Sequence, residues 1–195
     1  MRRLIRFGTQ FLLSGVLIFT PFLYPSLAIS DELPSGQMTL ALLDASGNEL
    51  VIGTVDFSPT SVTGQRHYRL NIDHHRFTDH FLSMKELKCL EGKELWCRIP
   101  YPYANPQTIS ASDLRWLEHD LLFLFKRANE FGANFWNGIY YQLQLEDDSL
   151  RGTARAVDLN RLASPPDDQA VPPIGEYDSD EIEPGQRWLP GIIIR

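Results

Sequence analysis

Four of the five histidines in this chain lie within fourteen residues of one another and could together bind a metal ion. They are His67, His74, His75 and His80. Imidazole nitrogens, together with the nearby carboxylates of Asp73 and Asp79, are ligands that zinc accepts, three or four to a site. The competing interpretation is a polar loop without metal, because the adjacent His74 and His75 would point to opposite sides of an extended segment. A zinc-dependent hydrolase built on residues 67–80 is therefore one hypothesis for function.

A second group of candidate residues is aromatic. Residues 96–141 contain 11 of the 22 aromatic residues, a concentration that fits either a core or a ligand site. Aromatic rings at the mouth of a barrel can bind an apolar molecule or a sugar ring. In the segment PYPY, prolines restrict the backbone around the tyrosines, which suits recognition of a ligand or partner. The predicted binding face consists of Trp96, Tyr101, Tyr103 and Trp136.

Cys89 and Cys97 are the only cysteines, and they flank a polar turn around Lys93. The strand-like runs on either side predict a hairpin that places the two cysteines opposite each other, within reach of a disulfide bond. A redox pair is the alternative, but the spacing is C-x7-C rather than C-x-x-C. We therefore expect a structural disulfide.

Familiar catalytic motifs are missing from the sequence. It contains no G-x-S-x-G, H-E-x-x-H, P-loop or G-x-G-x-x-G pattern. The first functional hypothesis is accordingly a non-catalytic binding or interaction module without a cofactor. Its partner would be a small apolar or sugar-like ligand or an envelope protein, and a third hypothesis is a structural envelope protein without a small ligand.

The first residues predict export. Three arginines precede an apolar run from Phe11 to Tyr24, and small residues at positions 26 and 28 complete the pattern of a signal peptide over residues 1–28. The apolar run is too short for a membrane span, so we expect no stable span after cleavage. We therefore expect a periplasmic or secreted protein, which is also where a disulfide bond persists.

The charge of the exported part is strongly negative. Removing residues 1–28 leaves 15 basic and 25 acidic residues, a net charge of −10 compared with −7 for the whole chain. Such a balance argues against nucleic acid as a partner.

Alternating apolar and polar residues predict mainly β structure. Hairpins are expected over residues 38–57, 86–99 and 138–159, and a further strand over residues 66–73. One short helix is expected from about residue 110, although the following DLLFLFKR fits a buried strand equally well. About eight strands joined by short turns predict an antiparallel meander closing into a small lipocalin-like barrel, with a two-sheet sandwich as the alternative.

The composition changes after residue 163. Residues 164–186 hold seven acids and five prolines, and we expect an acidic loop there. Residues 187–195, RWLPGIIIR, are apolar again and predict a C-terminal strand of the same domain as residues 29–163. A free apolar end would otherwise favour aggregation.

Several segments resemble a known family. FLSMKELKCLEGKELWCRIPYPY, WNGIYYQLQL and RWLP are similar to the core of an uncharacterised family of small exported bacterial proteins. The resemblance covers most of residues 37–160 together with RWLP. It implies one globular exported domain and no particular activity, ligand or site.

Overall fold

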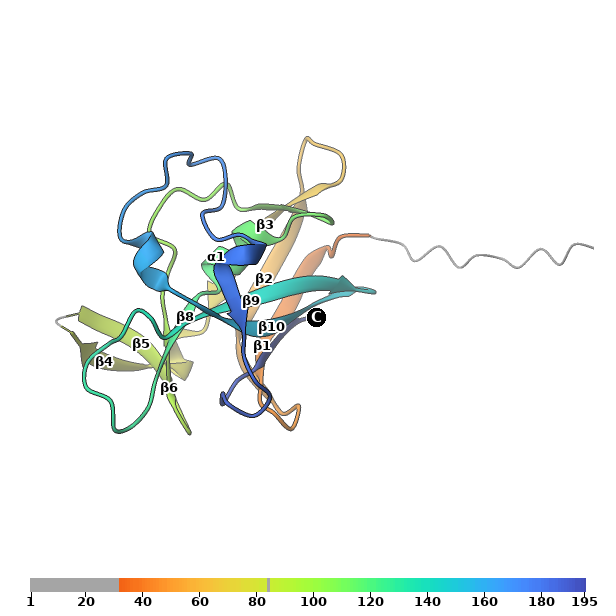
Figure 1. Cartoon of the computed structure of the whole chain (residues 1–195). Coiled ribbons are helices and arrows are strands. Elements are labelled where there is room, and N and C mark those ends of the chain that lie inside the picture. Colours follow the sequence, from red (N-terminus) through yellow and green to blue (C-terminus); the bar gives the residue numbers. More distant parts are fainter. Residues whose placement is uncertain (1–31, 84) are drawn as a thin grey trace, which may run out of the picture.

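The computed structural model of this chain describes residues 32–83 and 85–195 and is mainly β, with twelve antiparallel strands in one sheet (Figure 1). The predicted signal peptide, residues 1–28, lies outside the described residues. The strands are β1 (Gly36–Leu43), β2 (Glu49–Pro59), β3 (Gln65–Ile72), β4 (Thr78–Leu82), β5 (Lys85–Glu91), β6 (Leu95–Arg98), β7 (Thr108–Ser110), β8 (Phe123–Lys126), β9 (Gly138–Glu146), β10 (Ser149–Val157), β11 (Ser179–Glu181) and β12 (Gly191–Ile194). The helical elements are α1 (Arg115–Asp120) and the 3₁₀ turns η1 (His74–Arg76), η2 (Leu159–Leu162) and η3 (Glu176–Asp178).

The prediction of a mainly β, antiparallel fold with one short helix is confirmed, but a closed barrel is not shown. Hydrogen bonds connect the strands in the order β4-β5-β6-β8-β9-β10-β12-β1-β2-β3-β7, with β11 added to β10. Within the described part of the chain, β4 and β7 form the two ends of this order and do not pair with each other. In Figure 1 the β4–β6 strands extend to one side of β1, β2, β9 and β10. The sheet is also continuous, so it does not divide into the two separate sheets of the alternative prediction.

The β9–β10 hairpin follows directly from the sequence. Nine consecutive residues of each strand pair in register around a two-residue turn at Asp147 and Asp148. Asp147 has a φ of 50°, a left-handed conformation that aspartate tolerates better than most residues. The alternate residues Ile139, Tyr141 and Leu143 are buried, as the period of two in the sequence predicts.

The C-terminal segment forms an internal strand. β12 pairs with β1 on one side and with β10 on the other, so it joins the N-terminal hairpin to the β9–β10 hairpin. Ile192 and Ile194 are fully inaccessible to solvent, and Ile193 is nearly so. The preceding Trp188 packs against Gly92, where a Cβ atom would lie 2.3 Å from the indole ring. Glycine at this position therefore lets the β5–β6 turn approach the chain end.

The predicted disulfide bond is confirmed. Cys89 and Cys97 lie directly opposite each other on β5 and β6 and are bonded. Both sulfur atoms are buried together with Leu87 in a small cluster beside the main core. Leu82, Leu95, Ile99 and Ala133, all partly buried, pack against this cluster.

Helix α1 is shorter than its apolar pattern allowed. α1 ends at Asp120, and residues 123–126 of the ambiguous DLLFLFKR form strand β8 between β6 and β9. All four residues of β8 are buried, which explains why their pattern alternates neither as an exposed strand nor as an amphipathic helix. Among the residues that the structure describes, no helix has the length and apolar character needed to cross a membrane.

Residues 164–186 are more ordered than their composition indicates. They contain η3 and β11, and β11 pairs with the end of β10. Arg155 holds β11 through its guanidinium, which donates to the Ser179 hydroxyl at 2.9 Å and to the Ser179 carbonyl at 3.0 Å. Ile174 is fully buried. The buried Ile174 and the bonds from Arg155 thus help to anchor a segment in which most residues are exposed.

The internal position of β12 gives a stability prediction. Ile194 lies opposite Leu40 of β1 and Leu150 of β10 and is completely buried. Ile194→Ala should lower the free energy of unfolding by about 2–5 kcal/mol, whereas Ile194→Val should lower it by only about 0.5–1.5 kcal/mol. Urea denaturation of the two variants measures the difference. Equal unfolding midpoints for wild type and Ile194→Ala would contradict the internal placement of this strand.

Candidate functional site

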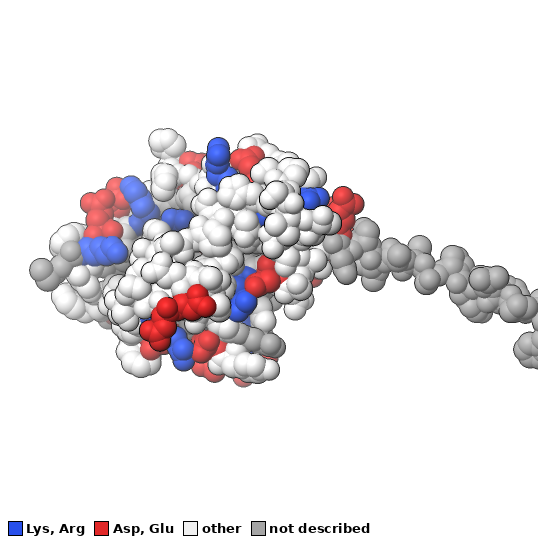
Figure 2. Space-filling model, turned by 90° about the horizontal axis from the view of Figure 1, so that it is seen from above, with Lys and Arg blue, Asp and Glu red and all other residues white. Residues whose placement is uncertain are grey.

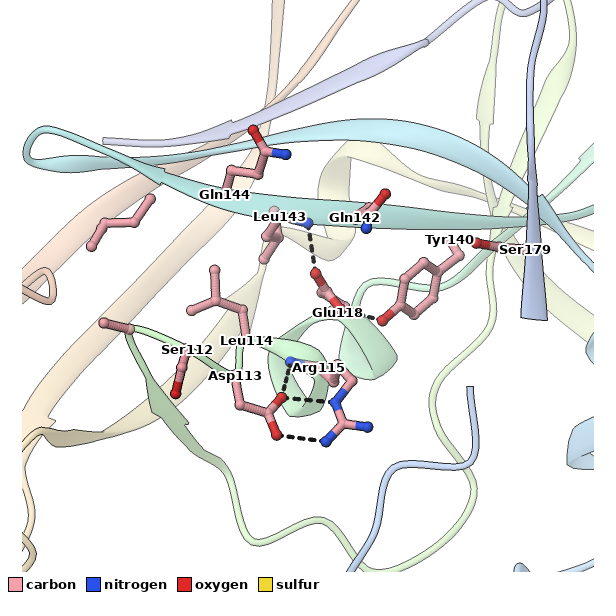
Figure 3. A pocket seen from close by; sticks show the side chains of 12 residues that line it. Ser112, Asp113, Leu114, Arg115, Glu118, Tyr140, Gln142, Leu143, Gln144 and Ser179 are labelled. Atoms are coloured by element: carbon pink, nitrogen blue, oxygen red, sulfur yellow. Dashed lines mark hydrogen bonds and ion pairs between the residues drawn. The ribbon is translucent and has the colours of Figure 1, made fainter. Parts of the chain in front are cut away.

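A polar groove of about 680 Å³ lies between strand β9 and the segment that leads from β7 into α1 (Figure 3). One wall is formed by the outer half of β9, from Tyr140 to Leu145, and the other by residues 111–115. Glu118 of α1 lies at the base of the groove, and Ser179 of β11 lies at one end. The groove is thus bounded by segments that are far apart in the chain, and it follows the part of β9 that β8 does not pair with.

The groove exists because β8 covers only the beginning of β9. Phe123 and Leu124 pair with Ile139 and Gly138, and pairing on this edge of β9 then stops. On its other edge, β9 is paired with β10 along its whole length. Residues 141–145 therefore have one free edge within the described structure, and this edge faces α1 and the groove.

Glu118 partly replaces the missing strand. Its Oε1 atom accepts a hydrogen bond of 2.6 Å from the backbone N–H of Leu143, on the free edge of β9. Its Oε2 atom accepts a hydrogen bond from the hydroxyl group of Tyr140. Glu118 is only 4% exposed, so these bonds compensate for the loss of water around its carboxylate. The buried side chain thereby joins α1 to the sheet.

Burial raises the pKa of Glu118 to about 7, although the hydrogen bonds from Tyr140 and Leu143 oppose the shift. Burial also raises the pKa of Tyr140, as does the adjacent carboxylate of Glu118. Near neutral pH, Glu118 therefore exists in both protonation states. In one state it only accepts hydrogen bonds, and in the other it can donate one to Tyr140 or to a bound molecule.

The wall opposite β9 carries an ion pair. The Arg115 guanidinium donates to both carboxylate oxygens of Asp113, at 2.9 and 2.7 Å. These bonds lower the pKa of Asp113 and raise that of Arg115. Both side chains are more than one-third exposed, so the pair contributes little to stability but presents fixed charges to the groove.

His119 is the histidine that the sequence analysis did not select, and it is completely buried. Its Nδ1 lies 2.7 Å from the Arg115 carbonyl, and its Nε2 accepts a bond of 3.1 Å from the N–H of Ile174. This pattern requires the proton on Nδ1. Burial lowers the pKa of His119 to about 4, so the ring is neutral at physiological pH. Because both nitrogens are occupied, His119 anchors residues 164–186 and is not available as a base.

The predicted aromatic face is not assembled in one place. Trp96 is fully buried between β5 and β8 and offers no surface to a ligand, whereas Trp136 is 69% exposed. Tyr101 and Tyr103 do lie together, with ring centroids 5.7 Å apart in an edge-to-face arrangement. Tyr103 donates to the Leu162 carbonyl at 2.7 Å. Tyr101 lines a cavity that is separate from the groove.

The predicted metal-binding histidines do not converge. His67 contacts the Gln107 carbonyl at 2.7 Å, and His80 contacts Glu91 at 2.8 Å. His74 and His75 are exposed in η1. Across residues 32–83 and 85–195, no group of three or more histidine, cysteine, aspartate or glutamate side chains is placed to hold a metal ion. The zinc site proposed from the sequence is therefore not formed in this structure, because strand β3, turn η1 and strand β4 direct these side chains to different partners.

One groove residue, Glu118, could have been recognised from the sequence by its position in the predicted helix. Glu118 follows Leu114 by four residues and precedes Leu121 by three, so it lies on the apolar face of the predicted helix. A carboxylate at such a position must find hydrogen-bond donors when the helix packs. The donors themselves, on β9, become recognisable only in the folded chain.

The buried carboxyl group gives a pH prediction. The folded protein keeps the Glu118 proton up to about pH 7, whereas the unfolded chain releases it near the ordinary value of 4.5. This stabilisation is present at low pH and is lost as the pH rises through 7. The lowered pKa of His119 has the opposite effect as the unfolded chain loses its proton around pH 6.5, and this effect is the same in wild type and in a Glu118 variant.

Between pH 6.5 and pH 8, the free energy of unfolding should therefore fall by about 1 kcal/mol more in wild type than in Glu118→Gln. Urea denaturation at both pH values, with the exposed Glu146→Gln as control, measures the difference. The control should behave as wild type. The same pH dependence in Glu118→Gln would show that this carboxyl group is not responsible.

Comparison of the chain with known proteins found no matching family model, no similar curated protein and no similar solved structure. The groove and its chemistry therefore carry the functional argument.

Proposed function

We propose that this chain is an exported, non-catalytic binding protein that holds an extended peptide segment of another protein along the free edge of β9. The observation that carries the proposal is the uncovered half of this strand, which faces an open groove. Addition of a strand to an exposed sheet edge is a common mode of peptide recognition, because the main chain supplies hydrogen bonds for any sequence.

Backbone groups on this edge are available for pairing. In an antiparallel ladder, the N–H and C=O groups of successive residues point to opposite edges. Leu143 directs its N–H away from β10 to Glu118, so Leu145, two residues later, directs its backbone groups the same way. Among the described residues, neither group of Leu145 has a hydrogen-bond partner on this side. An incoming strand would satisfy both.

The side chains of the groove favour a peptide over a sugar ring. Gln142, Gln144 and Ser112 supply hydrogen-bonding groups, and Leu143 and Leu145 supply short apolar surfaces. Tyr140 is the one aromatic residue in the lining, and its hydroxyl group is bound to Glu118. A sugar site would place aromatic faces against the ring. Alternating polar and apolar contacts suit the alternating side chains of a strand.

Two observations support export. The Cys89–Cys97 bond fits an oxidising compartment outside the cytoplasm. The sequence pattern of residues 1–28 is that of a signal peptide. Figure 2 shows acidic and basic side chains interspersed over the face in view.

The test begins with a phage-displayed library of random peptides selected on the immobilised protein. An enriched peptide is synthesised and its affinity is measured by isothermal titration calorimetry. Leu145→Pro removes the N–H that faces the groove, and proline is tolerated on a strand edge, so we expect affinity to fall about tenfold. Leu145→Ala, which keeps the N–H, is the matched control and should change affinity by much less.

A second arm needs no protein variant. Peptides N-methylated at alternate residues lose backbone donors on one edge only. One of the two alternate series should bind and the other should not. A library without enriched peptides, or peptides equally indifferent to Leu145→Pro and to N-methylation, would rule out strand addition at β9.

A further inference from the structure

A second, mainly apolar cavity of about 370 Å³ lies between strand β5 and the PYPY segment. Its apolar lining comprises Ile72, Phe77, Leu87, Pro100, Tyr101 and Pro102. Phe77 and Leu87 are buried in the fold, and the prolines restrict the backbone on the opposite side. The cavity is therefore built from rigid elements, and its size falls within the range of small-molecule sites.

Two polar groups in the lining are buried and have no partner. The Tyr101 side chain is 9% exposed, and its hydroxyl group makes no hydrogen bond to any described residue. The Nε of Arg98, which lines the same cavity, is also buried without a partner in the described structure. Buried polar groups are nearly always paired in native proteins, so two in one cavity indicate a missing acceptor.

The charge of Arg98 is not neutralised by an ion pair with any described residue. Its Nη2 donates to the backbone carbonyl of Asp120 at 3.3 Å, while the Asp120 carboxylate accepts from Tyr68 at 2.8 Å. Burial lowers the pKa of Arg98, and the charge of Asp120 opposes this shift only in part. An unneutralised guanidinium in an apolar cavity favours an anionic ligand.

The rim of the cavity adds to this positive charge. Lys85 and Lys88 line it, together with His74 and one acidic residue, Glu86. Lys88 is paired with Asp79 at 2.5 Å, whereas Lys85 has no ion pair with a described residue. In a chain whose net charge is −7, a cavity with an excess of cations is a local exception.

We propose that this cavity binds one molecule of an aliphatic carboxylate, with its head group at Arg98 and Tyr101 and its tail among the apolar residues. A carboxylate can accept hydrogen bonds from both the arginine Nε–H and the tyrosine O–H, the two groups that have no partner in the described structure. The tail would contact Phe77, Leu87 and the proline rings. Lys85 at the rim would attract the anion during entry. This site is independent of the peptide groove on β9.

The test uses dodecanoate as the probe, with binding measured by isothermal titration calorimetry below its micellar concentration. Tyr101→Phe deletes only the unpaired hydroxyl group, so it should leave the melting temperature unchanged or raised. It should weaken dodecanoate binding about tenfold, because a hydrogen bond to a charged group is lost. Tyr103→Phe is the matched control, since that hydroxyl group bonds to Leu162 and not to the cavity. It should leave dodecanoate binding unchanged.

Ligand variants test the head group and the tail separately. Dodecanol and dodecyltrimethylammonium should bind much more weakly than dodecanoate if Arg98 recognises the anion. Shortening the chain to decanoate or octanoate should weaken binding about fourfold for each methylene group removed, as expected for a buried tail. Leu145→Pro, at the other site, should have no effect on any of these ligands.

Three results would overturn the proposal. Absence of dodecanoate binding to wild type would show that the cavity is not such a site. Equal binding by dodecanoate and dodecanol, or by wild type and Tyr101→Phe, would show that the polar pair does not recognise the head group. Sedimentation of the protein with vesicles of anionic lipid, without binding of monomeric dodecanoate, would indicate a membrane surface instead.

Discussion

The structure depends on how helix α1 fills the gap beside the half of β9 that has no neighbouring strand. Where this edge is buried, as at the Leu143 N–H, a backbone group with neither water nor a ladder partner would be costly. Helix α1 occupies this position and contacts both β9 and β7. Glu118 accepts from the Leu143 N–H on one side, and Asp120 accepts from Tyr68 of β3 on the other. This short helix thus connects β9 with β3, two strands that do not pair directly with each other.

The same constraint explains why two consecutive titratable residues, Glu118 and His119, are buried and the next, Asp120, is half-buried. Glu118, His119 and Asp120 each point to a different element: the β9 edge, the segment before η3 and strand β3. Each side chain is hydrogen-bonded, so the cost of burial is partly offset. A helix this short has little intrinsic stability, and its position is held by these contacts. The groove is the part of the gap that α1 leaves uncovered.

The two proposed sites offer a ligand different kinds of contact. The groove offers backbone groups along a strand edge and is mainly polar, so it suits a ligand that is itself a backbone. The second cavity is mainly apolar and contains a guanidinium and a phenol without partners, so it suits an anion with an apolar tail. Of the two proposed sites, only the second is bordered by β5. The Cys89–Cys97 bond ties β5 to β6 and so restrains this wall of the cavity.

The local features of this protein were readable from its sequence, because they depend on neighbouring residues. The period-two pattern of residues 139–145 identified a strand, and the positions of Cys89 and Cys97 around a turn identified their pairing. Tertiary structure alone decided the rest. Residues 123–126 became a strand because neighbours bury both of their faces, which periodicity cannot reveal. Trp96 entered the core while Trp136 stayed exposed, although both are tryptophans near strands. The sheet remained open because α1 took the place of a pairing strand, and the groove depends on hydrogen bonds between residues 25 positions apart, which no local pattern encodes.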